Sequence, residues 1–114
     1  MNFAGFRAAV AWRDDSVTVA AFGELDLDSG PELWQVLGCC LHGRIQQLVV
    51  DLSGVTFCDC SGLSVLLQAR EQSLTANIDL VLVTARAPEV TQLFKLTGAD
   101  TLFGLTTCTT DAAG

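Results

Sequence analysis

The residues best suited to chemistry in this sequence gather in one short run, residues 58–62 (CDCSG). Asp59 is a typical helix N-cap, because a carboxylate can accept hydrogen bonds from backbone N–H groups two and three residues further on. Cys60 and Ser61 would then lie in the first helical turn, beside unpaired amide donors and the positive end of the helix dipole. A phosphate attached to a side chain in this turn would be well stabilised.

A strand before this run and a helix after it are expected to position these side chains. Residues 48–50 (LVV) form a short apolar run that ends on Asp51, which predicts a buried strand. Residues 53–54 (Ser-Gly) have turn chemistry, and Phe57 is expected to return to an apolar environment. One face of the following helix is predicted to be buried, with Leu63, Leu66, Leu67, Arg70 and Leu74.

The rest of the chain alternates between strand and helix patterns. Strands are predicted at residues 6–13, 17–22, 48–50 and 78–83, with a short last one at 102–106. Helices are predicted to begin near Asp28, Asp59 and Ala87, and the first and third are predicted to end at Gly43 and Gly98. We therefore predict an α/β fold, in which an opening antiparallel hairpin leads into a mixed, mostly parallel sheet of about five strands with about three helices.

The composition indicates one acidic domain. The chain has 114 residues, 50% of them hydrophobic, and a mean hydropathy of +0.44, and Trp12 and Trp34 are expected to pack in or over the core. No apolar run approaches the roughly 18 residues of a membrane span. A net charge of −7 without a basic cluster argues against nucleic-acid binding through phosphate contacts. Five cysteines and an N-terminus unlike a signal peptide predict reduced thiols in a cytoplasmic protein.

Two motifs are similar to those of a known family. Residues 51–63 (DLSGVTFCDCSGL) follow the pattern D-L-S-G-V-T-F-x-D-x-S-G-L, and residues 23–26 (GELD) lie at the expected distance upstream. This combination resembles the signature of the STAS domain family, whose small bacterial members are anti-sigma factor antagonists. The resemblance implies a single STAS-like domain over residues 1–114, with a core at about 7–106. Residues 107–114 are small and polar without a helical pattern, which predicts a frayed tail.

The resemblance also implies a function. Proteins of this kind bind a kinase-type anti-sigma factor and so release a sigma factor, which regulates transcription. Binding would use the first turn of the central helix and the loop that follows the second strand. The partner-binding residues implied in this way are Asp26, Asp59, Cys60, Ser61, Gly62 and Leu63. The protein itself would be no enzyme, would need no cofactor or metal, and its oligomeric state is left open.

In phosphorylated family members the acceptor hydroxyl directly follows the motif aspartate, and the corresponding residue here is Cys60. A protein kinase positions a hydroxyl for in-line attack on a phosphate, and a thiol is a poor substitute. One interpretation is an antagonist that has lost this switch. Another moves the phosphate to Ser61, although one step along a helix turns the side chain by roughly 100°.

Other functions remain open. A redox sensor could use Cys58 and Cys60, although free cysteines are often buried, which favours a small buried hydrophobic residue at Cys58. Zinc needs about four ligands, and the other candidates, Cys39, Cys40 and His42, belong to a different predicted helix. An alternative from another class is a STAS subunit docked on the ATPase of an ABC-type lipid-transport complex. No nucleotide-binding loop or catalytic serine motif is present.

Overall fold

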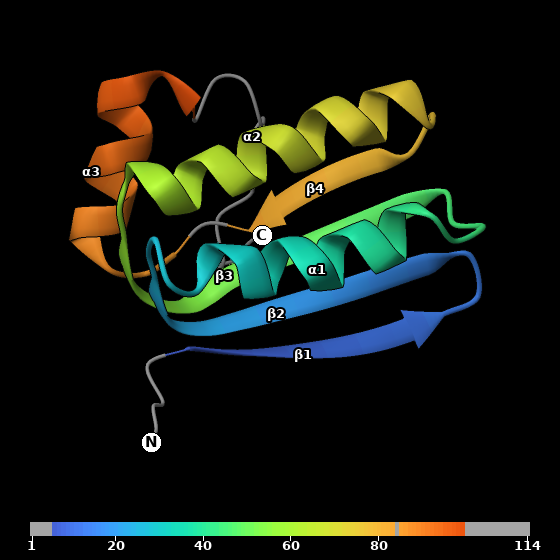
Figure 1. Cartoon of the computed structure of the whole chain (residues 1–114), viewed down its shortest axis with the longest axis horizontal. Helices are drawn as coiled ribbons and strands as arrows, with labels where there is room; N and C mark the ends of the chain where they lie inside the picture. Colours follow the sequence, from blue (N-terminus) through green and yellow to red (C-terminus); the bar gives the residue numbers. More distant parts are fainter. Residues whose placement is uncertain (1–5, 84, 100–114) are drawn as a thin grey trace, which may run out of the picture.

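Four strands form a mixed sheet in the computed structural model, which describes residues 6–83 and 85–99 (Figure 1). They are β1 (Phe6–Arg13), β2 (Ser16–Leu25), β3 (Gln47–Cys58) and β4 (Asp79–Val83), in the order β1-β2-β3-β4. β1 and β2 are antiparallel, whereas β2 pairs with β3, and β3 with β4, in parallel. The predicted hairpin and parallel sheet are therefore confirmed. The strand predicted at residues 102–106 and the tail at 107–114 lie outside the described residues.

The opening hairpin forms because two aspartates occupy its tight turn. Asp14 adopts a left-handed conformation, with a φ of 51°, and the Oγ of Ser16 donates a hydrogen bond to the carbonyl oxygen of Arg13 at 3.2 Å. Beyond the turn the side chains of β2 alternate, and Val17 and Val19 are fully buried. One face of β2 therefore lies against the helices, and the other is partly exposed.

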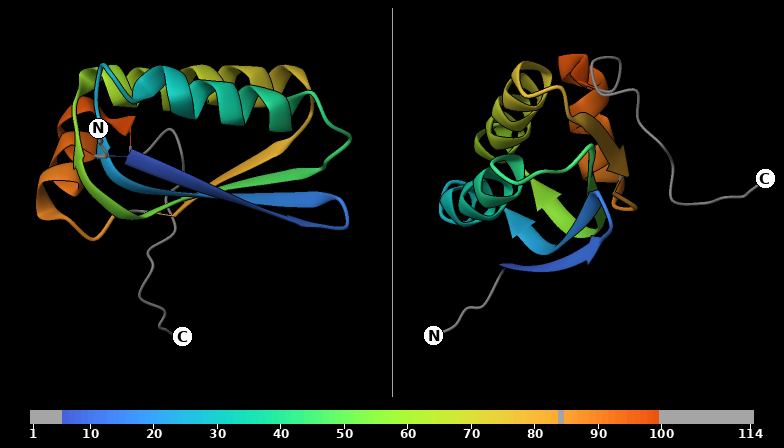
Figure 2. Two further views of the ribbon diagram at one scale, coloured as in Figure 1. Left: turned by 60° about the horizontal axis from the view of Figure 1, so that its bottom comes forward. Right: turned by 90° about the vertical axis from the view of Figure 1, so that its right-hand side faces the viewer.

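Two helices, α1 (Gly30–Leu41) and α2 (Cys60–Thr75), lie side by side over one face of the sheet (Figure 2). A third, α3 (Pro88–Thr97), packs against β3 at the end of the sheet where α2 begins (Figure 1). The core consists mainly of aliphatic side chains, and its largest fully buried members include Leu25, Leu33, Leu37, Leu48, Leu52, Leu66 and Leu82. Each such leucine contributes about 1.5–3 kcal/mol through burial, so this core is the main favourable contribution to folding.

The helix ends follow the signals that the sequence provides. Pro31 and Pro88 stand in the first turns of α1 and α3, where a missing N–H costs no intrahelical hydrogen bond. α3 ends at Gly98, whose left-handed φ of 78° closes the helix. None of the helices in the described part of the chain is long and apolar enough to cross a membrane.

The turn predicted at residues 53–54 is wrong, because β3 continues through them. The backbone N–H of Ser53 donates to Oδ1 of Asp51 at 2.9 Å, a turn-like hydrogen bond that remains inside the strand. Two register shifts relative to β2 mark bulges that absorb the extra residues of β3. Gly54 fits there because any Cβ would overlap the ring of Phe22.

Two predicted core positions are also wrong. Leu74 is 59% exposed, because Ser73 takes the inward position near the end of α2 and one residue turns the helix by about 100°. Trp12 is 59% exposed, because β1 lies at the edge of the sheet. Trp34, as expected, is half-buried against the core.

We predict that Gly54→Ala destabilises the protein, because the new methyl group would overlap the ring of Phe22 and would lie 3.1 Å from the carbonyl oxygen of Ala21. The expected loss is about 1–3 kcal/mol in the free energy of unfolding, measured by urea denaturation. Gly38→Ala is the matched control, because nothing lies within 4 Å of the added Cβ and alanine favours a helix by up to about 1 kcal/mol. Equal stability of Gly54→Ala and the wild type would contradict this close packing of β2 and β3.

Candidate functional site

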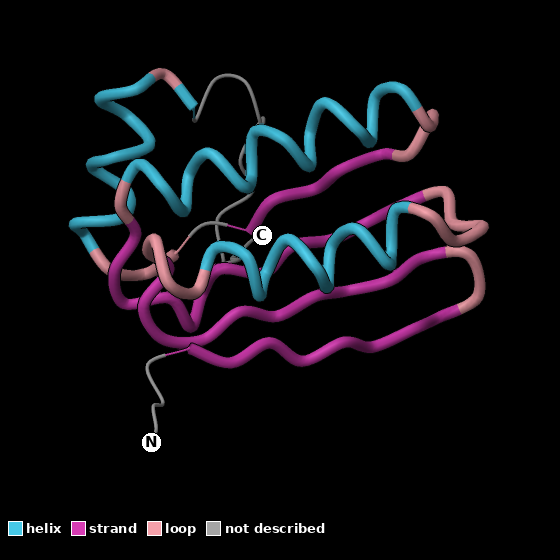
Figure 3. The backbone as a smooth tube through the Cα atoms, viewed as in Figure 1, coloured by secondary structure: helices cyan, strands magenta, loops and turns pink. Residues whose placement is uncertain are grey.

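The carboxyl ends of two parallel strands bring together the two segments that the sequence analysis associates with partner binding (Figure 3). Leu25 at the end of β2 is the register partner of Cys58 at the end of β3. The backbone N–H of Asp59 donates to the carbonyl oxygen of Leu25 at 3.2 Å. The loop of residues 26–29 therefore lies beside the first turn of α2, at the edge of the sheet where ligands of parallel α/β proteins commonly bind.

Asp59 caps α2, as the sequence predicts. Its backbone is extended, with a φ of −108° and a ψ of −173°, and its Oδ1 accepts a hydrogen bond from the backbone N–H of Gly62 at 3.1 Å. The N–H of Leu63 donates to the carbonyl oxygen of Asp59 at 3.0 Å. This geometry fixes Cys60 and Ser61 in the first turn, where Cys60 is exposed and Ser61 is partly exposed.

Gly62 determines how closely this turn approaches β2. A Cβ at this position would lie 2.6 Å from both the Cγ atom and the carbonyl oxygen of Leu25, closer than real Cβ atoms come. Gly62 is buried and Leu63 is only 4% exposed, so neither presents a side chain to a partner. Their contribution is to hold the first turn of α2 in place.

The loop after β2 is fixed by a set of short hydrogen bonds around Asp26. Its Oδ1 accepts from the backbone N–H groups of Asp28 at 3.0 Å and of Ser29 at 3.1 Å. The Oγ of Ser29 accepts from the N–H of Asp26 at 2.9 Å and donates to the carbonyl oxygen of Glu24 at 2.7 Å. These bonds, above all the one from the N–H of Ser29, lower the pKa of Asp26, so its carboxylate is charged at neutral pH.

The sequence analysis missed this bracing role of Ser29. It treated residues 28–29 only as the beginning of a helix, yet Ser29 makes no side-chain hydrogen bond to α1 and instead stabilises the loop. The sequence does contain a signal for this loop. An aspartate such as Asp26 commonly accepts hydrogen bonds from the backbone N–H groups two and three residues further on, which forms an Asx turn.

An open groove of about 350 Å³ separates this loop from α2. It is lined by Asp26, Leu27, Gly30, Pro31, Ser61, Ser64, Val65 and Gln68. Ser61 thus faces the same groove as Asp26, whereas Cys60 is not among the lining residues. The side chains of Cys60 and Ser61, the two candidate phosphate acceptors, therefore lie in different surroundings, as expected for neighbours on a helix.

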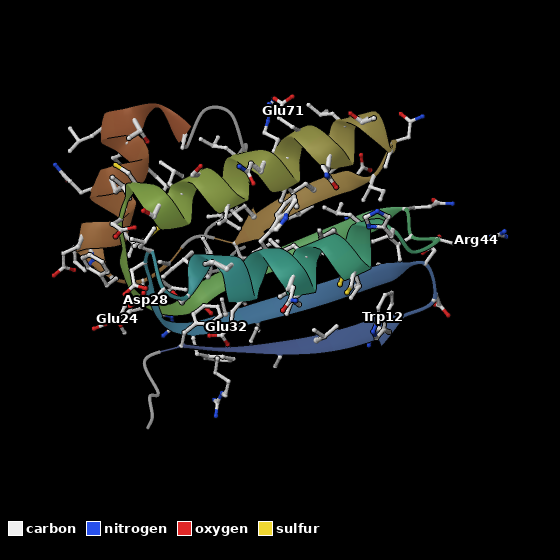
Figure 4. The ribbon with its side chains drawn as sticks, in the orientation of Figure 1. Trp12, Glu24, Asp28, Glu32, Arg44 and Glu71 are labelled. Carbon is white, nitrogen blue, oxygen red and sulfur yellow. The ribbon has the colours of Figure 1, made fainter. Side chains whose placement is uncertain are left out.

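Apolar and acidic side chains gather at this end of the sheet. Leu27 is 73% exposed and Phe57 is 43% exposed, so the apolar environment expected for Phe57 is wrong. Phe57 is the register partner of Glu24, which is exposed. Figure 4 shows Glu24, Asp28 and Glu32 at the same end of the molecule. The surface around the first turn of α2 therefore combines exposed apolar area with negative charge.

The two thiols beside the cap have opposite environments. Cys58 is 6% exposed, and burial raises its pKa to about 12, with Asp59 and Cys60 adding to the effect. Its interpretation as a small buried hydrophobic residue agrees with this placement, whereas Cys60 is an exposed free thiol. Within residues 6–83 and 85–99, no three His, Cys, Asp or Glu side chains are grouped so that they could hold a metal ion.

The chain matches a known family model and several solved structures. Residues 8–107 match the family model described as "Mlab, STAS domain". The crystal structure of an anti-sigma factor antagonist from Mycobacterium paratuberculosis has 31% sequence identity and a TM-score of 0.79, over 88% of this chain and 84% of that one.

Two structures of the anti-sigma factor antagonist SpoIIAA share the fold at lower identity. The unphosphorylated form has 17% identity and a TM-score of 0.77, over 90% of this chain and 89% of that one. The phosphorylated form, described as a Bacillus cell fate determinant, has 16% identity and a TM-score of 0.70, over 90% and 92%.

Proposed function

The chain belongs to the STAS domain family, and on that basis we propose that it is an anti-sigma factor antagonist. In this proposal it binds a kinase-type anti-sigma factor in the cytoplasm and so releases a sigma factor for transcription. The observation that carries the proposal is the 31% identity with the mycobacterial antagonist over 88% of the chain. The capped first turn of α2 supports it, because it displays polar side chains on a rigid element beside a braced loop.

The proposed partner surface consists of four exposed or partly exposed residues held by two buried ones: Asp26, Asp59, Cys60 and Ser61, with Gly62 and Leu63. Leu27 and Phe57 add exposed apolar area, and Glu24 and Asp28 add negative charge. Protein interfaces commonly combine an apolar centre with a polar rim. An anti-sigma factor that fits this surface should therefore offer an apolar pocket bordered by basic side chains.

Cys60 occupies the position at which phosphorylation would normally control partner binding. A thiol at the acceptor position leaves no hydroxyl there, so in our proposal the protein keeps binding its partner in the presence of ATP. Ser61 is the remaining hydroxyl of the turn, and it lines the groove together with Asp26. A phosphate on Ser61 would add about −1.5 to −2 charge beside that carboxylate, and this repulsion disfavours Ser61 as the acceptor.

The buried thiol argues against a redox sensor that uses both cysteines. With a pKa of about 12, Cys58 is almost entirely protonated at neutral pH, and the thiolate is the reactive form. Regulation through a thiol would therefore depend on Cys60.

We predict that Leu27→Asp weakens binding to a kinase-type anti-sigma factor from the same genome by at least tenfold, or about 1.4 kcal/mol, measured by isothermal titration calorimetry. The reason is that Leu27 is 73% exposed and lines the groove beside the first turn of α2. Leu74→Asp is the matched control, because Leu74 is 59% exposed near the other end of α2.

Equal affinities of the wild type and Leu27→Asp would remove this surface from the interface. If the wild type binds no such anti-sigma factor and instead forms a stable complex with the ATPase of an ABC-type lipid-transport system, the transport function replaces the proposed one.

A second prediction concerns the acceptor position. With the anti-sigma factor and ATP, Cys60→Ser should gain one phosphate at position 60 and then lose affinity, whereas the wild type should stay unmodified and bound. Intact mass and peptide mapping measure the phosphate. Cys39→Ser, the same change at an exposed cysteine on α1, is the control and should gain none. Phosphate on Ser61 of the wild type, with loss of binding, would show instead that the switch has moved by one residue.

A further inference from the structure

β1 is an edge strand of the described sheet and lacks the features that normally protect such an edge. It pairs with β2 without a register shift from Phe6 to Arg13. Residues 8–12 (AAVAW) contain no charge and no proline. Natural edge strands usually avoid pairing with other chains by means of charges, prolines, bulges or short length. None of these devices interrupts β1 between Arg7 and Arg13.

The exposed apolar side chains of β1 lie on the helix side of the sheet. Val10 and Trp12 are the cross-strand partners of Val19 and Val17, which are fully buried under the helices. Cross-strand partners share a face, yet Val10 is 43% and Trp12 is 59% exposed. Figure 2 shows that α1 and α2 lie over the other strands of the sheet, and that β1 lies at the edge outside this helix layer. Within the part of the chain that the structure describes, this edge therefore combines backbone groups that have no partner strand with exposed apolar side chains.

We propose that β1 pairs antiparallel with β1 of a second copy of this chain, about a two-fold axis at Ala9. An axis at Val10 would set Arg7 opposite Arg13 of the other copy, and like charges directly opposite each other are destabilising. An axis at Ala9 avoids this and pairs residues 6–12 of each copy, whereas an axis at Ala11 pairs only residues 9–13. The arrangement at Ala9 is thus the longest register of β1 without opposed arginines.

The side chains fit this register. It places Phe6 opposite Trp12 of the second copy, an aromatic cross-strand pair, and Ala8 opposite Val10. The guanidinium of Arg7 lies 5.0 Å from the centroid of the Phe22 ring, so it is held over β2 rather than beyond the edge. A two-fold pairing of this kind uses the same surface on both copies and removes both exposed edges at once.

The oligomeric state of the full chain tests this proposal by sedimentation velocity over a dilution series. The wild type should form a dimer, and Val10→Lys should raise the dimer dissociation constant at least tenfold, because the two lysines would lie diagonally across the axis on the same face of the sheet, where their charges repel. Leu96→Lys is the matched control, since Leu96 is 76% exposed on α3, and it should leave the dimer unchanged. A wild type that is monomeric at every concentration, or a dimer unaffected by Val10→Lys, would overturn the proposal.

Cysteine cross-linking tests the register separately. In a background of Cys39→Ser, Cys60→Ser and Cys108→Ser, Ala9→Cys should form an intermolecular disulfide on mild oxidation. Residues at the axis lie about 4.5–5.5 Å apart between Cα atoms, which suits a disulfide. Ala11→Cys is the control, because its two copies would be separated by about 14 Å along the strands. Cross-linking through Ala11→Cys and not Ala9→Cys would overturn the register.

Discussion

The contact between Gly62 and Leu25 is the constraint on which the proposed site depends. Because no side chain separates them, the first turn of α2 lies directly against the end of β2. The hydrogen bond from the N–H of Asp59 to the carbonyl oxygen of Leu25 and the Asp59 cap then fix the orientation of that turn. The exposed thiol of Cys60 and the partly exposed hydroxyl of Ser61 are therefore presented by rigid backbone rather than by a loose loop.

The loop that faces this turn is held by a different set of forces. Asp26 and Ser29 satisfy several backbone groups between them, so the loop keeps its shape without support from the hydrophobic core. The two segments meet along an open groove, and Leu27 stands exposed beside it. A partner that covers this groove would meet two preformed segments and would pay little ordering entropy on binding.

Much of this arrangement could be predicted from the sequence, because local signals decide it. The Asp59 cap, the hairpin turn and the left-handed Gly98 depend on residues a few positions apart. The errors arise where distant residues decide the outcome. Gly54 has the chemistry of a turn residue but serves a bulge that accommodates Phe22 of another strand. The exposure of Trp12 depends on which strand forms the edge of the sheet, and the strand order cannot be predicted from the residues near Trp12.

The most direct test of the proposed partner surface is hydrogen exchange of the wild-type protein, alone and bound to a kinase-type anti-sigma factor, measured amide by amide. Slow exchange reports amides that binding protects from solvent and from local opening. We expect new protection in residues 26–29 and 57–64, with little change near the end of α2. Protection confined to other elements, with these two segments unchanged, would contradict the assignment of the partner surface.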